Sequence, residues 1–230
     1  MIRVAALLFF ASLAAAAAPP TEVSAQYAIT TSGMTIGHVS ENFVRKAGTY
    51  TIQSVTRSEG LLKAFVDDEF TAESTGRVDS HGLQPLTYTE HRARDGKRDL
   101  RSEFDWDKGV MRTMSGGQNS EVALPGQTQD RISMMYQFMN QKAFGDTFVV
   151  PMAERRKIET YTYRLVEEVK ITTAIGDFDT LHYERVLNDP KDTRADVWLA
   201  KDRFNFPVRV VLDDPKRYRL EQTVVALDAK

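Results

Sequence analysis

Met134, Met135 and Met139 lie within one short segment of the chain and have Phe138 among them. Methionine is flexible and polarizable, which suits a surface that accepts varied apolar partners. Most apolar helices in small domains fill the core, while a cavity for an acyl chain is the alternative, and both remain open. If the segment binds a ligand, we predict an apolar lining of six side chains: Met134, Met135, Phe138, Met139, Tyr161 and Tyr163.

The polar residues show none of the spacings that enzymes or metal sites require. The sequence has no G-x-S-x-G motif for a serine nucleophile, and runs such as Glu167-Glu168 point to opposite faces of a strand. No histidine is spaced from another histidine or a carboxylate as metal ligands are. We therefore predict that the protein is not an enzyme and has no catalytic residues, metal or cofactor. The four histidines are His38, His81, His91 and His182.

Apolar and polar side chains alternate with a period of two along most of the chain. Phe206, Val208, Val210 and Leu212, for example, lie on one face of a single segment. Such alternation is typical of strands with one face toward a core, and closely spaced turn residues favour antiparallel meanders. The predicted fold class is mainly β, a curved antiparallel sheet or incomplete β-barrel of about ten to twelve strands with one packed helix.

One segment has the periodicity of a helix instead. Ile132, Met135, Tyr136 and Met139 fall at positions i, i+3, i+4 and i+7. This spacing predicts a helix over residues 130–142, capped by its first residue or by the threonine shortly before it. The segment is apolar over more than one face, so we expect the concave face of the sheet to cover it.

The dipeptide Asp95-Gly96 is a strong signal for a two-residue hairpin turn. With that turn, Glu90 lies opposite Arg101 on the neighbouring strand. Opposite charges facing one another across two strands support this register.

The first residues have the layout of a secretory signal peptide. Arg3 precedes the short apolar run Val4–Leu13, and a series of alanines follows before Pro19. We predict a signal peptide over residues 1–18 and export to the periplasm. Residues 19–25 then form a loose N-terminus, and residues 26–228 form a single β-rich domain.

Composition excludes several classes of protein. The chain has no cysteine, so it forms no disulfides, thiolate metal sites or cysteine nucleophile. Its formal net charge is −2 and its charges are mixed, which argues against a nucleic-acid partner. No long apolar stretch follows the first run, so we expect that the protein does not span the membrane.

Several short motifs resemble a family of exported bacterial proteins, the domain of unknown function numbered 3108. These motifs are Ser58–Gly60, Ser74–Gly76, Gly82–Tyr88, Asp196–Asp202 and Phe206–Val210. The resemblance covers most of the chain after the signal peptide, and no catalytic residues can be carried over from it.

The order of Trp198, a charged turn and Pro207 also resembles the final hairpin of periplasmic Lol-type lipoprotein carriers. That resemblance is limited to the C-terminal part of the chain. It implies a curved antiparallel half-barrel, closed by helices around an apolar cavity for acyl chains.

Three functions are consistent with these observations. The first is a periplasmic binding or carrier protein for a lipid or other apolar molecule, without catalysis. The second is a non-catalytic protein–protein adaptor of the envelope, which would have a filled interior and an exposed apolar patch. The third and least supported is a hydrolase, which needs a polar cleft where a histidine or a carboxylate pair converges.

Overall fold

The computed structural model describes residues 18–59, 69–140 and 145–230, and these contain fourteen antiparallel strands in one sheet. The strands show the predicted alternation; in β1, Val23, Ala25 and Tyr27 are buried and the residues between them are exposed. The strands are β1 (Glu22–Thr31), β2 (Met34–Lys46), β3 (Thr49–Ser58), β4 (Phe70–Asp79), β5 (Gly82–Arg92), β6 (Leu100–Asp105), β7 (Val110–Ser115), β8 (Gln118–Ala123), β9 (Thr147–Ala153), β10 (Ile158–Thr173), β11 (Gly176–Arg185), β12 (Arg194–Ala200), β13 (Phe206–Asp214) and β14 (Tyr218–Ala229).

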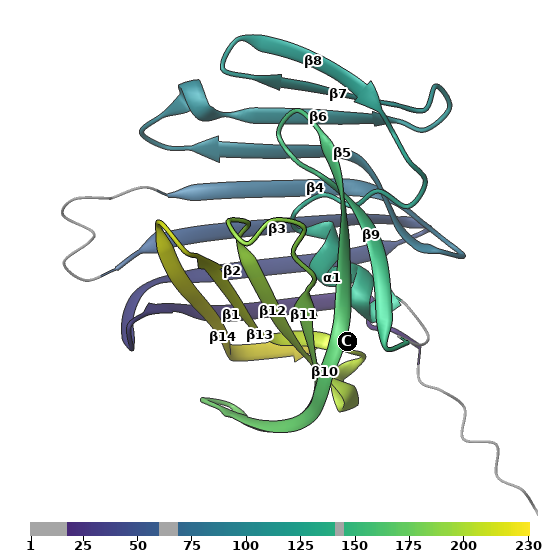
Figure 1. The fold of residues 1–230 in the computed structure, drawn as a ribbon. Coiled ribbons are helices and arrows are strands. Elements are labelled where there is room, and N and C mark those ends of the chain that lie inside the picture. Colours follow the sequence, from purple (N-terminus) through teal and green to yellow (C-terminus); the bar gives the residue numbers. More distant parts are fainter. Residues whose placement is uncertain (1–17, 60–68, 141–144) are drawn as a thin grey trace, which may run out of the picture.

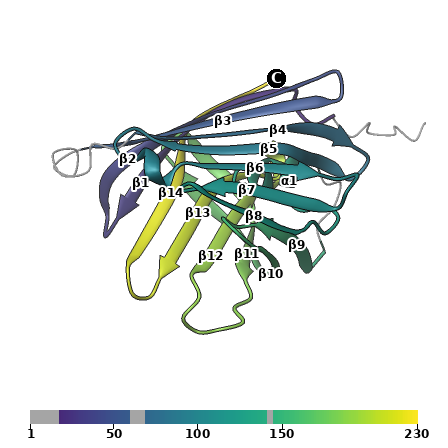
Figure 2. The ribbon, with the colours of Figure 1, turned by 90° about the horizontal axis from the view of Figure 1, so that it is seen from above.

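Nearly every strand pairs with the strands before and after it in the chain. The first strand, β1, also pairs with the last, β14, so the sheet edges are β8 and β9 in the middle of the sequence. The sheet curls without closing into a barrel (Figure 1). Figure 2 shows the strands from above, arranged around the interior in which α1 lies. The predicted mainly β, barrel-like fold class is therefore confirmed.

The sheet has more strands than the ten to twelve that the alternation predicts. Strand β8 illustrates the reason: it lies at the edge of the sheet, and none of its residues is buried. A strand without a buried face has no apolar alternation in its sequence.

The helix α1 spans Ser133–Asn140, inside the predicted range of residues 130–142. Asp130 precedes it as the cap, and residues 141–142 lie outside the described part of the chain. The helix contacts β5 and β13, which lie on opposite sides of the curled sheet. Its two faces enter two different apolar clusters: Tyr136 and Met139 pack in one, while Met134 and Phe138 pack in the other. The concave face therefore covers the helix, as its apolar faces predict.

Two local expectations differ from the structure. Glu90 pairs with Leu100 and not with Arg101, and a 3-10 helix over Gly96–Arg98 (η2) replaces the two-residue turn. A shift of one residue would turn Leu100 outward, so burial of this leucine overrides the turn signal.

The sheet also begins earlier than predicted. Residues 22–25, expected in a loose N-terminus, belong to β1, where they pair with both β2 and β14. Val23 and Ala25 are buried, which holds this segment in the sheet. The predicted signal peptide falls almost entirely on residues 1–17, outside the described residues.

Candidate functional site

Asp130 fixes the start of α1 and ties the helix to the sheet. Its Oδ1 accepts hydrogen bonds from the backbone N–H groups of Ile132 (3.0 Å) and Ser133 (2.8 Å), which makes it the helix cap. Its Oδ2 accepts a hydrogen bond from the hydroxyl of Ser74 on β4 (2.5 Å). Burial of this carboxyl group raises its pKa from 3.8 to about 6. Thr128, the other predicted cap, instead donates to a carbonyl in the preceding turn.

Two further side chains of α1 bond to the inner face of the sheet. The amide of Gln137 accepts the backbone N–H of Leu83 (2.7 Å) and donates to the carbonyl of His81 (2.8 Å). The hydroxyl of Tyr136 donates to the carboxyl group of Glu41 on β2 (3.0 Å). These bonds fix the position and rotation of the helix, and thereby decide which methionines face the interior.

A cavity of about 620 Å³ lies between α1 and the facing parts of the curled sheet, with walls from both halves. Its volume is within the range of small-molecule sites in proteins, about 300–1,000 Å³. The side chains along the helix and the nearby strands form an apolar surface that we call the floor. The floor consists of Ile132, Met134, Met135, Phe138, Met152, Tyr163, Val197, Val210 and Leu212.

Five of the six predicted lining residues lie on this cavity. Met134, Met135 and Phe138 reach it from α1, and Tyr161 and Tyr163 reach it from β10. Met139 does not line it. This methionine packs in the same apolar cluster as Tyr136, because it follows Tyr136 by three residues and lies on the same face of the helix.

Two carboxyl groups reach the cavity wall and are already hydrogen-bonded. Glu41 accepts hydrogen bonds from Tyr136 and from the hydroxyl of Ser54 (3.2 Å), and burial raises its pKa. Glu90 accepts a hydrogen bond from Tyr88 (2.9 Å). Because Tyr88 is buried and lies beside this carboxylate, its pKa is well above 10.0. These groups are bonded within the wall.

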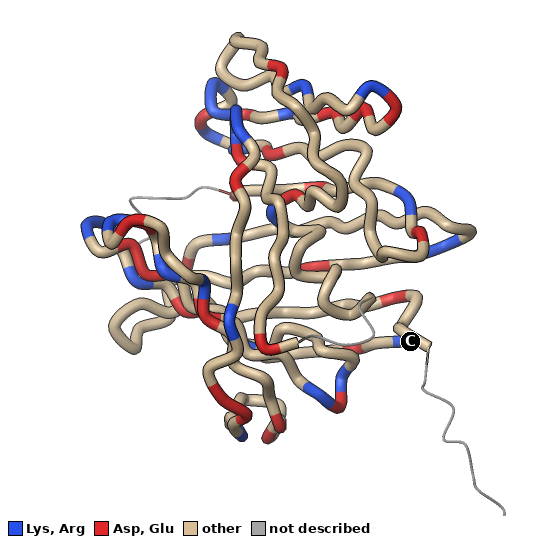
Figure 3. Tube along the Cα trace, turned by 45° about the vertical axis from the view of Figure 1, so that its right-hand side comes forward, with Lys and Arg blue, Asp and Glu red and all other residues tan. Residues whose placement is uncertain are grey.

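The remaining charged residues gather away from the floor, at what we call the mouth of the cavity. Some of them pair with one another, as Lys157 does with Glu159, while Glu154 accepts a hydrogen bond from Tyr161 (2.6 Å). Figure 3 shows how positive and negative residues are interspersed along the chain. The mouth consists of Arg92, Arg98, Arg131, Glu154, Arg155, Lys157, Glu159, Arg185, Asp192 and Asp196.

No pattern in the sequence predicts the mouth. Its residues come from strands and turns far apart in the chain, and no spacing in the sequence associates Arg92 with Arg131, for example. The apolar alternation places Arg92 on the same face as Glu90, but only the curl of the sheet brings the helix start to that face.

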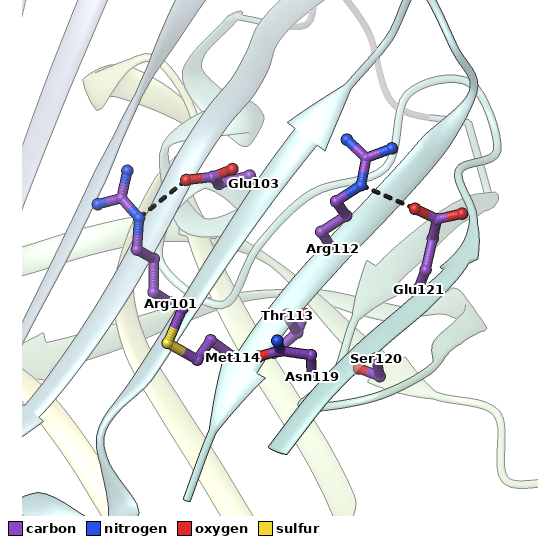
Figure 4. A pocket seen from close by; sticks show the side chains of 8 residues that line it. All are labelled: Arg101, Glu103, Arg112, Thr113, Met114, Asn119, Ser120 and Glu121. Atoms are coloured by element: carbon purple, nitrogen blue, oxygen red, sulfur yellow. Dashed lines mark hydrogen bonds and ion pairs between the residues drawn. The ribbon is translucent and has the colours of Figure 1, made fainter. Parts of the chain in front are cut away.

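A second hollow, of about 390 Å³, lies over strands β6, β7 and β8 (Figure 4). Arg101 pairs with Glu103 at 3.0 Å, and Arg112 pairs with Glu121 at 2.7 Å. Met114, which is 56% exposed, lies among these charges. We refer to this site as the outer hollow.

The histidines lie in separate places. His182 stacks on Trp198 and bonds to Asp196 at 2.9 Å, whereas His91 bonds to Asp99 at 2.8 Å. Among the described residues, no group of three or more histidine or acidic side chains could hold a metal ion. The described residues that line the cavity and the outer hollow include no histidine, the usual base for a serine nucleophile.

The comparisons with known proteins identify a family and a fold. A family model described as "Protein of unknown function (DUF3108)" matches residues 26–221, so the chain belongs to this family. No curated protein matches the chain. In the described part, no helix has the length and apolar character needed to cross a membrane.

Among solved structures, the chain is similar to a beta-barrel-like protein of the domain of unknown function DUF1849 from Brucella abortus. The similarity covers 93% of this chain and 100% of the other, with a TM-score of 0.59 and 12% sequence identity. The two proteins therefore share their fold, and the similarity carries no assignment of function.

Proposed function

We propose that this member of the DUF3108 family is an exported, non-catalytic binding or carrier protein for a lipid or other apolar ligand of the bacterial envelope. The observation that carries the proposal is the cavity of about 620 Å³ above an apolar helix. A domain of this size normally fills its interior to close packing. Open volume beside Met134, Met135 and Phe138 is therefore a feature that a ligand could use.

The side chains of the floor suit an apolar ligand of variable shape. Methionines fill irregular gaps and adapt to different partners. Polar anchors on Tyr136, Gln137 and Asp130 hold the helix, so the methionines are free to contact a ligand while the backbone stays in place. A fixed frame with adaptable side chains is consistent with a carrier that accepts a class of molecules.

The proposed location rests on the N-terminal sequence. Removal of the predicted signal peptide would leave all of β1, which begins at Glu22. The small residues of Val23-Ser24-Ala25 offer a second, later cleavage site, but cleavage after Ala25 would remove Val23 and Ala25, which are both buried in the sheet. The early cleavage is therefore the one compatible with the intact fold.

The test is mass spectrometry of organic extracts from protein purified out of the periplasm, combined with uptake of a fluorescent fatty acid. Wild-type protein should carry copurified lipid and bind the fluorescent probe. Met135→Glu places a charge on the floor and should abolish both signals. Met114→Glu makes the same change in the outer hollow and should leave both unchanged.

Circular dichroism and thermal unfolding of each variant establish that the fold is retained. Extracts without lipid from the wild type, together with no uptake of the probe, would remove the carrier proposal. Unchanged binding of the probe by Met135→Glu would show that the probe binds outside the cavity.

An adaptor is the alternative function, and the edge strand β8 favours it. Among the described strands it pairs with β7 alone, so one edge of its backbone can accept a further strand. An adaptor would retain its partner after Met135→Glu and lose it when β8 is changed, for example by Ser120→Pro.

A further inference from the structure

Two arginines from distant parts of the chain converge at the mouth of the cavity. Arg92 lies at the end of β5, directly across from Phe70 on β4. Its guanidinium carbon is 4.7 Å from the centre of the Phe70 ring, and that of Arg131, just before α1, is 5.8 Å from it. All three residues line the cavity.

Among the described residues, Asp99 lies close enough for its charge to act on Arg92, but it forms no ion pair with that guanidinium group. No carboxylate of those residues forms an ion pair with Arg92 or Arg131, and the buried Nε of Arg92 has no hydrogen-bond acceptor. The nearest acidic residues are engaged elsewhere. Glu90 bonds to Tyr88 and Arg155, and Asp99 bonds to His91 and to the backbone N–H of Arg92.

Two like charges at one ring repel each other, and the aromatic face offsets only part of this cost. A buried guanidinium N–H without an acceptor adds a further cost. Most other charged groups of the cavity have partners within the wall or the mouth. The convergence of Arg92 and Arg131 on Phe70 is therefore a place where an external anion would complete the bonding.

We propose that Arg92 and Arg131 form an anion-binding site that holds the oxyanion head group of an amphipathic ligand, whose chain lies on the floor of the cavity. This inference rests on the proposed carrier function and adds a head-group class to it. A carboxylate or a phosphate monoester presents oxygens that guanidinium groups bind through charge-assisted, bidentate hydrogen bonds. Ile132 and Met135 line the same cavity as the two arginines, so the apolar chain of the ligand can lie against them.

The test compares ligands that share a chain and differ in the head group. Dodecanoate, dodecan-1-ol and inorganic phosphate are titrated into the full mature protein at pH 7 in a calorimeter. We expect dodecanoate to bind about tenfold more tightly than dodecan-1-ol, since a hydrogen-bonded charge pair supplies at least this factor. Inorganic phosphate has no alkyl chain to contact the floor, and salt screens its charge. It should therefore show no binding at concentrations up to about 1 mM.

The double variant Arg92→Gln/Arg131→Gln should bind the acid and the alcohol equally. The matched control Arg101→Gln/Arg112→Gln removes two arginines from the outer hollow and should keep the preference for the acid. If the double variant does not fold, the preference of the wild-type protein and its loss in high salt still decide the question.

Each outcome separates this inference from the carrier proposal. Equal affinity of the wild type for acid and alcohol would overturn the anion site and leave the carrier function standing. If neither dodecanoate nor dodecan-1-ol binds, both the anion site and the carrier function are overturned. Phosphate that binds as tightly as dodecanoate would show a site for free anions and contradict the amphipathic ligand.

Discussion

The cavity inside the curl and the outer hollow on β6–β8 both combine methionine with arginine, but they differ in how the charges are satisfied. In the outer hollow, Arg101 and Arg112 each lie within 3.0 Å of a glutamate carboxylate. In the cavity, the guanidinium groups of Arg92 and Arg131 lie at one aromatic ring, and no carboxylate in the described part of the chain forms an ion pair with either. A hollow whose charges are already paired has little to offer a ligand, whereas unpaired charges beside an apolar floor can contribute to binding.

The two sites also differ in their frame. The floor of the cavity belongs to a helix held by buried hydrogen bonds, and Asp130 and Gln137 make several of them. The outer hollow belongs to three strands, and the arginine and glutamate side chains that line it are exposed. Substitutions in the helix frame should therefore affect stability far more than equivalent substitutions around the outer hollow.

The largest effect is expected from Gly82→Ala, beneath the helix. Gly82 has a φ of +106°, and an added Cβ would lie 2.3 Å from the side-chain oxygen of Gln137. Relief of this clash requires loss of buried hydrogen bonds, so we expect a decrease of about 2–5 kcal/mol in the free energy of unfolding. Gly109→Ala, at a φ of +64° with open space around it, should cost about 1 kcal/mol. If urea titrations show equal losses of unfolding free energy in Gly82→Ala and Gly109→Ala, the contact between Gly82 and Gln137 does not stabilise the helix as described.

Asp130→Ala should have the next largest effect. It removes the acceptor for two backbone N–H groups at the helix start and for the hydroxyl of Ser74. The hydroxyl of Ser74 keeps its hydrogen bond with Tyr50, but two buried backbone N–H groups lose their acceptor, which should lower the free energy of unfolding by about 2 kcal/mol. Asp105→Ala near the outer hollow serves as the control. An equal fall in the thermal midpoints of the two variants would show that the helix frame is no more sensitive than the outer hollow.

The pH dependence of stability gives a third, smaller effect. The pKa of Asp130 is about 6 in the folded protein and near 3.8 when exposed, so the folded state takes up a proton first as the pH falls. The contribution of this group to stability therefore increases as the pH falls from 7 to 5, and it is lost again as the pH rises through about 6. Relative to Asp130→Asn, the wild type should gain about 1 kcal/mol over this interval. A constant difference between the two proteins in urea titrations at both pH values would show that the carboxyl group does not titrate in this range.

Arg112→Gln should have the smallest effect. Its ion pairs with Asp105 and Glu121 lie in water on the outer face, where such pairs contribute little. We expect no measurable change in the thermal midpoint or in fatty-acid binding. A clear loss of either would indicate that the outer hollow has a role of its own.

The elements that follow from local patterns could be predicted from the sequence. Alternation gave the strands, and the spacing of Ile132, Met135 and Tyr136 gave the helix, with Asp130 correctly among its predicted caps. Patterns failed where a strand has no buried face, as in β8, and where burial of Leu100 overrode a turn signal.

The candidate site was predictable only in part, for a similar reason. Five of its apolar residues lie in segments with clear periodicity, and these were found. Arg92 and Arg131 meet at Phe70 because the sheet curls around the helix, and no local spacing in the sequence encodes this curl. Met139 was misplaced because a helix of this composition is apolar on several faces, and the sequence does not tell which face borders open space.

The most direct test of the central claim, that the cavity holds an apolar chain, is a crystal structure of the mature protein with 12-bromododecanoic acid. The anomalous signal of bromine directly locates the end of the fatty-acid chain. We predict a bromine peak on the floor, beside Met135 and Phe138, with the carboxylate at Arg92 and Arg131. A peak beside Met114 in the outer hollow, or a cavity without ligand at saturating acid, would contradict the account.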